Sequence, residues 1–179
     1  EVDLVTPASL GLALGDVPET GATYPDNARL KALAYSTAAG MTAIADDSGI
    51  ELSDFGGWPG VHSVRFAGSG ANDQARRQAI LDRLAATPGA SRQARFQCCV
   101  VVAGGGVILA ESTGTLSGSI AWTPRGGGGF GYDSIFIPTG QRQTVAELLP
   151  HEKDAISHRS VAIAALRPFL ATLVKPSGK

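Results

Sequence analysis

The chain has 179 residues, of which 44% are hydrophobic and 17% are charged. This length is typical of one domain, and the apolar content excludes an intrinsically disordered chain. Fifteen basic and sixteen acidic residues give a net charge of −1, so there is no basic excess to neutralise a nucleic-acid backbone. No apolar stretch approaches the ~18 residues that a membrane span needs. We therefore expect neither a nucleic acid nor a membrane as a partner.

A helix is predicted to begin after Thr23, which is a typical N-cap residue. Pro25 suits the first turn, and Asp26 stands where a capping box places an acid. Gly40 is expected to end this helix. The positions that keep its helical period are Leu30, Leu33, Ala34 and Thr37.

A short apolar strand over residues 42–45 is expected to run into an Asp-Asp-Ser-Gly turn at 46–49 and to resume at 50–52. The stretch Gly-Gly-Trp-Pro-Gly at 56–60 predicts a loop. Asn72 is expected to cap a second helix over 73–86. In this helix Ala79, Ile80 and Leu84 are expected to face inward, and Arg76, Arg77 and Arg83 outward.

The second half of the chain is predicted to be rich in strands and to end in a helix. A long strand at 93–103 turns at 104–106 into a partner strand at 107–110, which predicts an antiparallel hairpin. Further strands fit 118–122 and 133–137, and Ser157 is expected to cap a last helix. Its inward stripe is Ala162, Leu166, Phe169, Leu170 and Leu173. The pattern indicates an α/β fold with a mixed, hairpin-containing sheet.

Two adjacent cysteines, Cys98 and Cys99, lie in the apolar strand at 93–103. Neighbouring residues of a strand point to opposite faces, so the pair is expected to be two buried thiols and not a disulfide. Such thiols fit a reducing compartment, and we expect a cytoplasmic protein.

The acidic pair Asp46-Asp47, followed by Ser48 and Gly49, is the first candidate for chemistry. Two carboxylates and a hydroxyl at the end of a strand form a compact set of oxygen ligands, which suits Mg²⁺. The competing interpretation is a polar turn with an Asx cap. The segment alone leaves both open.

The glycine run at 126–131 surrounds Phe130, which could offer a stacking surface for a base. The alternative is a flexible loop with a core phenylalanine. The run also matches the spacing Gly-x-Gly-x-x-Gly of dinucleotide-binding loops. We reject that interpretation because residues 132–137 are predicted to continue as a strand and not as a helix.

Three cations, Lys153, His158 and Arg159, lie just before or within the first turn of the last predicted helix. Helix N-termini ordinarily favour acids, so an anionic or polar ligand at this end would explain them. A solvated surface face is the alternative.

Six segments, taken together and in order, resemble the inosine/xanthosine triphosphate pyrophosphatase family. They are Ala45-Asp46-Asp47-Ser48-Gly49-Ile50, Gly56-Gly57-Trp58-Pro59-Gly60-Val61, Ala94-Arg95-Phe96, Gly129-Phe130-Gly131-Tyr132-Asp133, Ala146-Glu147-Leu148, and Glu152-Lys153 with Ile156-Ser157-His158-Arg159. The resemblance runs from Glu19-Thr20-Gly21 to the final helix.

The resemblance implies an elongated α/β fold, with a mixed central β-sheet, flanking helices and two lobes around a nucleotide cleft. It implies Mg²⁺-dependent hydrolysis of ITP, dITP and XTP to the monophosphate and pyrophosphate, which cleans the nucleotide pool. A homodimer is the usual assembly. Residues 1–179 are expected to form one such domain.

The same resemblance implies roles for individual residues. Asp47 is the expected general base and a metal ligand, with Asp46 and Asp26 as further ligands of the metal. Phe130 is expected to stack on the purine. The other expected substrate contacts are Ser48, Gly131, Tyr132, Asp133, Lys153, His158 and Arg159.

Three features depart from the family pattern. The family opens with a strand and a Thr-x-Asn-x-x-Lys phosphate-binding loop, and no such segment occurs in this sequence. Asp26 stands where the family has Glu, and Ser134 stands where it has Pro. The missing loop motivates an alternative function, a nucleotide-binding module without turnover.

Overall fold

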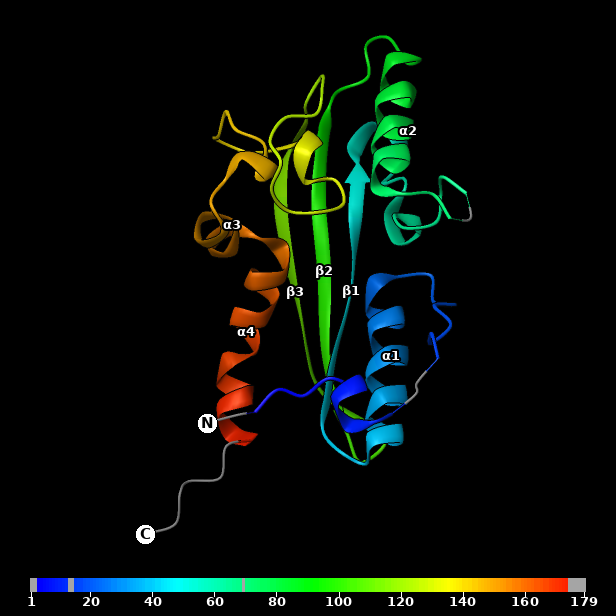
Figure 1. Ribbon diagram of the computed structural model, residues 1–179, viewed down its shortest axis with the longest axis vertical. Coiled ribbons are helices and arrows are strands. Elements are labelled where there is room, and N and C mark those ends of the chain that lie inside the picture. The colour runs from blue at the N-terminus through cyan, green and yellow to red at the C-terminus, as the bar shows by residue number, and fades with distance from the viewer. Residues whose placement is uncertain (1–2, 13–14, 69, 174–179) are drawn as a thin grey trace.

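The computed structural model describes residues 3–12, 15–68 and 70–173, which are built around one long sheet (Figure 1). Four strands lie in the order β1-β2-β3-β4, and every pairing among them is antiparallel. The strands are β1 (Ala43–Leu52), β2 (Gln93–Gly104), β3 (Val107–Ile120) and β4 (Phe136–Pro138). The α-helices are α1 (Tyr24–Ala39), α2 (Asp73–Ala85), α3 (Pro150–Ile156) and α4 (His158–Leu173).

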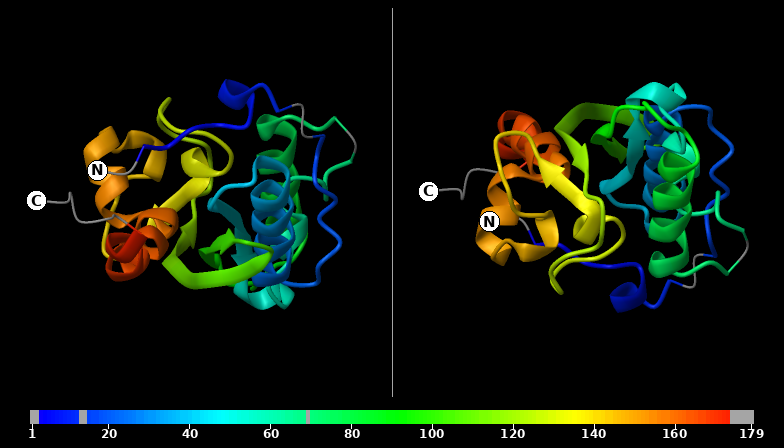
Figure 2. Two further views of the ribbon diagram at one scale, coloured as in Figure 1. Left: turned by 90° about the horizontal axis from the view of Figure 1, so that it is seen from below. Right: turned by 90° about the horizontal axis from the view of Figure 1, so that it is seen from above.

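The sheet is covered on both faces, with α1 on one side and α4 on the other (Figure 2). Alternation along β2 divides the core between them, because successive side chains leave a strand on opposite faces. Cys99, Val101 and Ala103 pack with the apolar side of α1, whereas Cys98, Val100 and Val102 pack with Ala162 and Leu166 of α4. Both cysteines are buried free thiols, as predicted.

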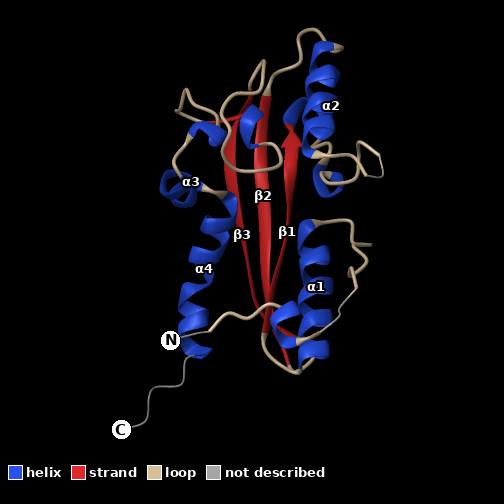
Figure 3. Cartoon of the chain, viewed as in Figure 1, coloured by secondary structure: helices blue, strands red, loops and turns tan. Residues whose placement is uncertain are grey.

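The molecule is elongated, and its helices flank the long sheet, with α2 and α1 along one side and α3 and α4 along the other (Figure 3). At one end α2 packs on the sheet through Ile80 and Leu84, which are both buried, as expected. The predicted α/β class with flanking helices is confirmed. The described strands form an antiparallel sheet, however, and not a mixed one.

The segment at 46–49 is not a turn, because it forms the middle of the continuous strand β1. All ten residues of β1 pair in register with β2, and this pairing overrides the local turn preference. Gly49 is needed for space: a Cβ there would lie 2.5 Å from Ser63 Oγ and 2.7 Å from Tyr24 Oη. The loop after β1 thus packs directly against the strand.

Several other boundaries and faces also differ from the prediction. The segments at 107–110 and 118–122 belong largely to one strand, β3, and residues 133–135 form a 3-10 turn before β4. The buried face of α1 consists of Tyr24, Asn27, Ala28, Ala32 and Ser36, so the predicted period was out of phase, although the predicted Leu33 packs against this core. Leu30 is exposed.

The predicted helix caps are confirmed. The side chain of Thr23 accepts a hydrogen bond from the backbone N–H of Asp26, and Asn72 accepts one from Ala75. Gly40 ends α1 in the left-handed conformation. Ser157 Oγ accepts a hydrogen bond from the backbone N–H of Ser160 at 3.1 Å, which caps α4. No helix of the described segments is long and apolar enough to cross a membrane.

The start of α4 lies against the backbone of β3 at Gly114. A Cβ at this position would overlap the carbonyl oxygen of His158 and would lie 2.6 Å from the backbone nitrogen of Ala162. The absence of a side chain therefore lets the helix that carries His158 and Arg159 rest directly on the sheet.

Candidate active site

Asp47 lies on the face of β1 that is covered by α1, and only 7% of its surface is exposed. Its Oδ1 accepts a hydrogen bond from Lys31 Nζ at 2.9 Å, and its Oδ2 accepts one from Asn27 Nδ2 at 3.2 Å. Lys31 also donates to Glu19 Oε1 at 2.7 Å. Burial raises the pKa of Asp47, although the Lys31 ammonium acts in the opposite direction. A buried carboxylate of raised pKa has the character of a general base.

Asp46 leaves the same strand on the opposite face, toward α4. Its Oδ2 accepts hydrogen bonds from Arg159 Nη2 at 2.8 Å and from Arg159 Nε at 3.2 Å. Arg159 Nη2 also lies 3.3 Å from Ser48 Oγ. Because β1 is continuous, the two adjacent carboxylates do not form the single oxygen cluster that a turn at 46–49 would create.

The three predicted metal ligands do not converge. Asp26 Oδ2 accepts a hydrogen bond from Thr23 Oγ1 at 2.6 Å, and Arg29 lies 3.7 Å from its other oxygen. Among the residues that the structure describes, no three His, Cys, Asp or Glu side chains are gathered as a ready-made metal site. The donor set that fits a hard cation best is Asp47 with Glu19, since these carboxylates already share one positive charge.

The loop of Phe130 presents its ring to solvent, and 66% of Phe130 is exposed. Asp133 fixes the loop, because its Oδ2 accepts hydrogen bonds from the Phe130 backbone N–H at 2.9 Å and from Lys153 Nζ at 2.6 Å. Lys153 Nζ lies 4.5 Å from the centre of the Phe130 ring. A Cβ at Gly129 would overlap the Asp133 carboxylate, so this position requires glycine. An exposed ring on an anchored loop can stack on a base.

Gly131 and Tyr132 hold the Phe130 loop in place. The N–H of Gly131 donates to Asp73 Oδ2 at 2.7 Å, and its carbonyl accepts a hydrogen bond from Arg77 Nη1 at 2.7 Å. Arg77 thus contacts the loop and does not only face solvent. Tyr132 is buried, and its hydroxyl donates to the carbonyl of Ser63. Both residues therefore fix the Phe130 loop to the rest of the protein.

Beside the loop, a small pocket is lined by Phe96, Leu116, Asp133, Val145, Lys153, Ser157 and His158. The imidazole of His158 stacks on Phe96, with 4.8 Å between the ring centres. Burial lowers the pKa of His158 to about 4, so this imidazole is neutral at pH 7. Its Nδ1 is buried and has no hydrogen-bond partner among the described residues. The pocket measures about 10 Å³, which is room for one water molecule, so this nitrogen is available to a single polar atom.

The structure therefore places the predicted residues, apart from Asp26, in two groups. The first is Asp47 on the α1 face, where it pairs with Lys31, a residue that the sequence did not predict. The second lies on the α4 side and contains Asp46, Ser48, Phe130, Asp133, Lys153, His158 and Arg159, with Gly131 and Tyr132 beneath the loop. Asp133 is close enough to Arg159 to raise its pKa, as Asp46 does more strongly. Since β1 is an edge strand of the described sheet, a ligand across this edge would face both groups.

Sequence reasoning missed Glu19, Asn27 and Lys31, which surround Asp47. Asn27 and Lys31 are four residues apart on α1 and therefore share one helix face. The sequence signal that could have identified them is a polar pair at this spacing on the helix that precedes the acidic strand.

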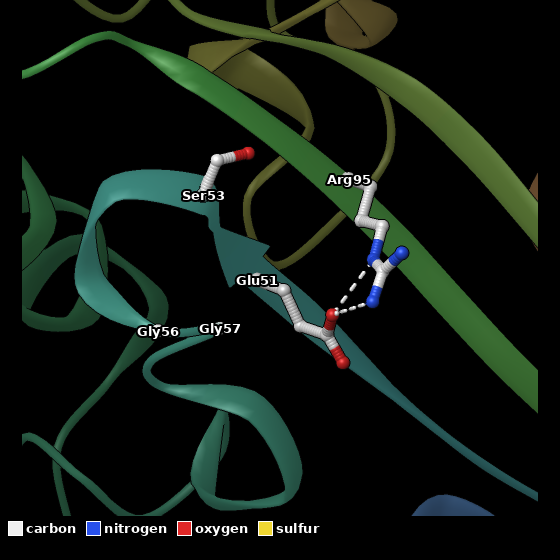
Figure 4. Close-up of a pocket in the computed structure, with 5 residues that line it drawn as sticks. All are labelled: Glu51, Ser53, Gly56, Gly57 and Arg95. Carbon is white, nitrogen blue, oxygen red and sulfur yellow. Dashed lines mark hydrogen bonds and ion pairs between the residues drawn. The ribbon is translucent and has the colours of Figure 1, made fainter.

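A wider hollow of about 500 Å³ lies on the α1 side of the sheet beyond Asp47, and none of the predicted residues line it. Its lining consists of Glu51, Ser53, Gly56, Gly57 and Arg95 (Figure 4). Arg95 Nη2 lies 2.7 Å from Glu51 Oε2, so the two charges in the hollow neutralise each other.

Comparison with known proteins shows which family this chain belongs to. A relative from Mycobacterium tuberculosis, a "dITP/XTP pyrophosphatase", is 45% identical over 169 residues, which cover 90% of this chain and 82% of the relative. A protein of the same name from Geobacillus kaustophilus is 46% identical over 164 residues, with coverage of 92% and 80%.

Two solved structures that are similar to this chain lead to the same family. A HAM1 protein from Coxiella burnetii matches with a TM-score of 0.83 at 40% identity, over 88% of this chain and 81% of that one. The Staphylococcus aureus Ham1 protein matches with a TM-score of 0.81 at 40% identity, over 89% and 82%. The model of the Ham1 family matches residues 2–169. The predicted resemblance is therefore confirmed, and this chain belongs to the Ham1 family.

Proposed function

We propose that this chain hydrolyses the non-standard purine nucleoside triphosphates ITP, dITP and XTP to the monophosphate and pyrophosphate. The observation that carries the proposal is the likeness, over about nine-tenths of the chain, to relatives named dITP/XTP pyrophosphatase. Such an activity removes unwanted nucleotides from the pool. The proposal includes a homodimer in the cytoplasm, which light scattering after size exclusion and cell fractionation would test.

In this proposal the base binds at the second group of residues. Phe130 stacks on the purine, and Lys153, held by Asp133, adds positive charge beside the ring. His158 and Arg159 bind the base edge. A 6-oxo group accepts hydrogen bonds, so donors aimed at it favour hypoxanthine and xanthine over adenine, whose amino group cannot accept them.

Asp47 is the proposed general base. Its burial and raised pKa favour removal of a proton from an attacking water. Lys31 holds the carboxylate on one side and Asn27 on the other, which fixes the direction of its lone pairs. Lys31 also supplies positive charge where the phosphate chain would lie, and most of the catalysis of phosphoryl transfer is positioning and charge neutralisation.

Mg²⁺ is the proposed cofactor. When bound, it would polarise the phosphate oxygens and neutralise developing charge. Asp47 is the proposed protein ligand, with Glu19 as the neighbouring oxygen donor. Asp26 remains a proposed ligand through the resemblance alone, since its carboxylate contacts Thr23 and Arg29 in this structure.

The test is pyrophosphate release from ITP in the presence of Mg²⁺, with ATP as the comparison substrate. We expect release from ITP to exceed release from ATP, and Asp47→Asn to abolish it in a chain that still folds. Glu111→Gln is the matched control, because Glu111 pairs with Arg29 at the surface, away from both groups. Binding of ITP without release would favour the binding module instead. Normal turnover in Asp47→Asn would exclude Asp47 as the base.

A further inference from the structure

Asp46 was expected to bind the metal, but its carboxylate does not lie beside the other proposed ligand, Asp47. What we infer from its position rests on the proposed function. Asp46 projects from β1 toward α4, whereas Asp47 projects toward α1. A single Asp46 oxygen, Oδ2, accepts from Arg159 Nη2 at 2.8 Å and Arg159 Nε at 3.2 Å, and the Cys98 thiol lies 3.6 Å from it. The positive charge nearest to the Asp46 carboxylate is therefore the Arg159 guanidinium, which belongs to the protein itself.

We propose that Asp46 is a positioning residue for Arg159, and that it acts in recognition of the nucleobase and not in binding of the metal. Two of the donating nitrogens of Arg159, Nε and Nη2, are held by one carboxylate oxygen, which fixes the plane of the guanidinium. Nη2 is further held by Ser48 Oγ at 3.3 Å. Nη1 has no protein acceptor within the described ranges, so it is the nitrogen left to bind a ligand.

The place of Arg159 in the fold supports this role. It follows His158, whose ring lines the small pocket beside Phe130, and both begin α4, which rests on Gly114. Helix α4 thus fixes the backbone of Arg159, and Asp46 fixes its guanidinium. A guanidinium has five donors in a rigid plane, so fixing one edge also orients the other.

A metal role for Asp46 is disfavoured by the same contacts. Its neighbours in space are Arg159, Ser48 and Cys98, whereas the second carboxylate that a hard cation would need, Glu19, lies beside Asp47 on the other face.

The test measures binding of inosine monophosphate in metal-free buffer by calorimetry, together with the Mg²⁺ concentration that half-activates ITP turnover. We expect Asp46→Ala to weaken inosine monophosphate binding about tenfold, since charged hydrogen bonds to Arg159 are lost. Asp46→Asn should give a smaller loss, because its amide oxygen still accepts. The half-activating Mg²⁺ concentration should stay unchanged in both variants. Glu111→Gln, which breaks a surface ion pair with Arg29, should match the wild type.

A double-mutant cycle separates positioning from an independent role. In an Arg159→Ala background, Asp46→Ala should cause no further loss of inosine monophosphate binding. A full additional loss, or unchanged binding in the single variants, would overturn the proposal, as would a tenfold rise in the half-activating Mg²⁺ concentration. If Asp46→Ala does not fold, Asp46→Asn carries the test.

Failure of the proposed function gives a different result. A wild-type chain that binds inosine monophosphate but releases no pyrophosphate refutes turnover and still reports on Asp46. A wild-type chain that does neither refutes both proposals, because Arg159 then has no base to recognise.

Discussion

Replacement of Lys31 by Met tests the electrostatics around Asp47 without relying on catalysis. Lys31 Nζ lies 2.9 Å from Asp47 Oδ1 and 2.7 Å from Glu19 Oε1, and the three side chains are 15%, 9% and 28% exposed. Methionine keeps much of the volume but leaves Asp47 without a counter-charge, while Glu19 keeps only the exposed Arg65, 3.3 Å away. Removing one partner of a buried ion pair costs about 3–5 kcal/mol. Because this cluster retains some solvent, we expect a loss of about 2–3 kcal/mol in the free energy of unfolding at pH 7.

The pH dependence of this loss gives the sharper test. Burial already raises the pKa of Asp47, and the substitution removes the ammonium that opposes this rise. A carboxyl whose pKa is higher in the folded state stabilises the fold when protonated and loses that contribution as the pH rises through the folded-state pKa. The difference from the wild type should therefore be largest at pH 7 and shrink toward pH 4.

Urea unfolding of both proteins at pH 4, 5 and 7 measures this difference. Arg29→Met is the matched control, since it breaks the exposed ion pair with Glu111 and should have a much smaller effect. If Lys31→Met costs no more than Arg29→Met at pH 7, or costs the same at all three pH values, then Lys31 does not hold the charge of Asp47 as argued.

Three further predictions concern the second group of residues and the core. Phe130→Ala should raise the KM for ITP about tenfold with little change in kcat, because stacking on a base contributes about 1–3 kcal/mol; an unchanged KM argues against stacking. The NMR titration of His158 should have a midpoint near 4, because burial lowers its pKa, and its contribution to stability should be complete above about pH 6.5 and be lost as the pH falls toward 4; a midpoint near 6.5 contradicts this environment. Burial raises the pKa of the Cys98 thiol to about 12, so iodoacetamide at pH 8 should leave it unmodified in the folded protein and alkylate it in urea; rapid native modification, seen by mass spectrometry, contradicts the burial.

The sequence predicted best those features that depend on near neighbours along the chain. The caps at Thr23 and Asn72 depend on a side chain and a backbone group three residues apart, and both are present. The α/β class and the two buried cysteines likewise follow from patterns within single segments. Local preference was wrong at 46–49, because ten residues of pairing with β2 outweigh the turn tendency of Asp, Ser and Gly.

The site could be predicted as a set of residues but not as an arrangement. In a strand, successive side chains point to opposite faces, so Asp46 points toward α4 and Asp47 toward α1. A turn at 46–49 would not separate them in this way. The partners Lys31 and Arg159 lie 16 and 113 residues away from these carboxylates. Only the three-dimensional pairing decides which cation meets which carboxylate.

The contact at Gly114 restricts how this protein can be altered. Its backbone angle is one that any residue can adopt, so the restriction comes from the lack of room between β3 and the start of α4. Even alanine would push that helix outward and carry His158 and Arg159 with it. In a library randomised at position 114 and selected for nucleotide binding, the recovered clones should encode glycine, although the position lies outside the ligand pocket.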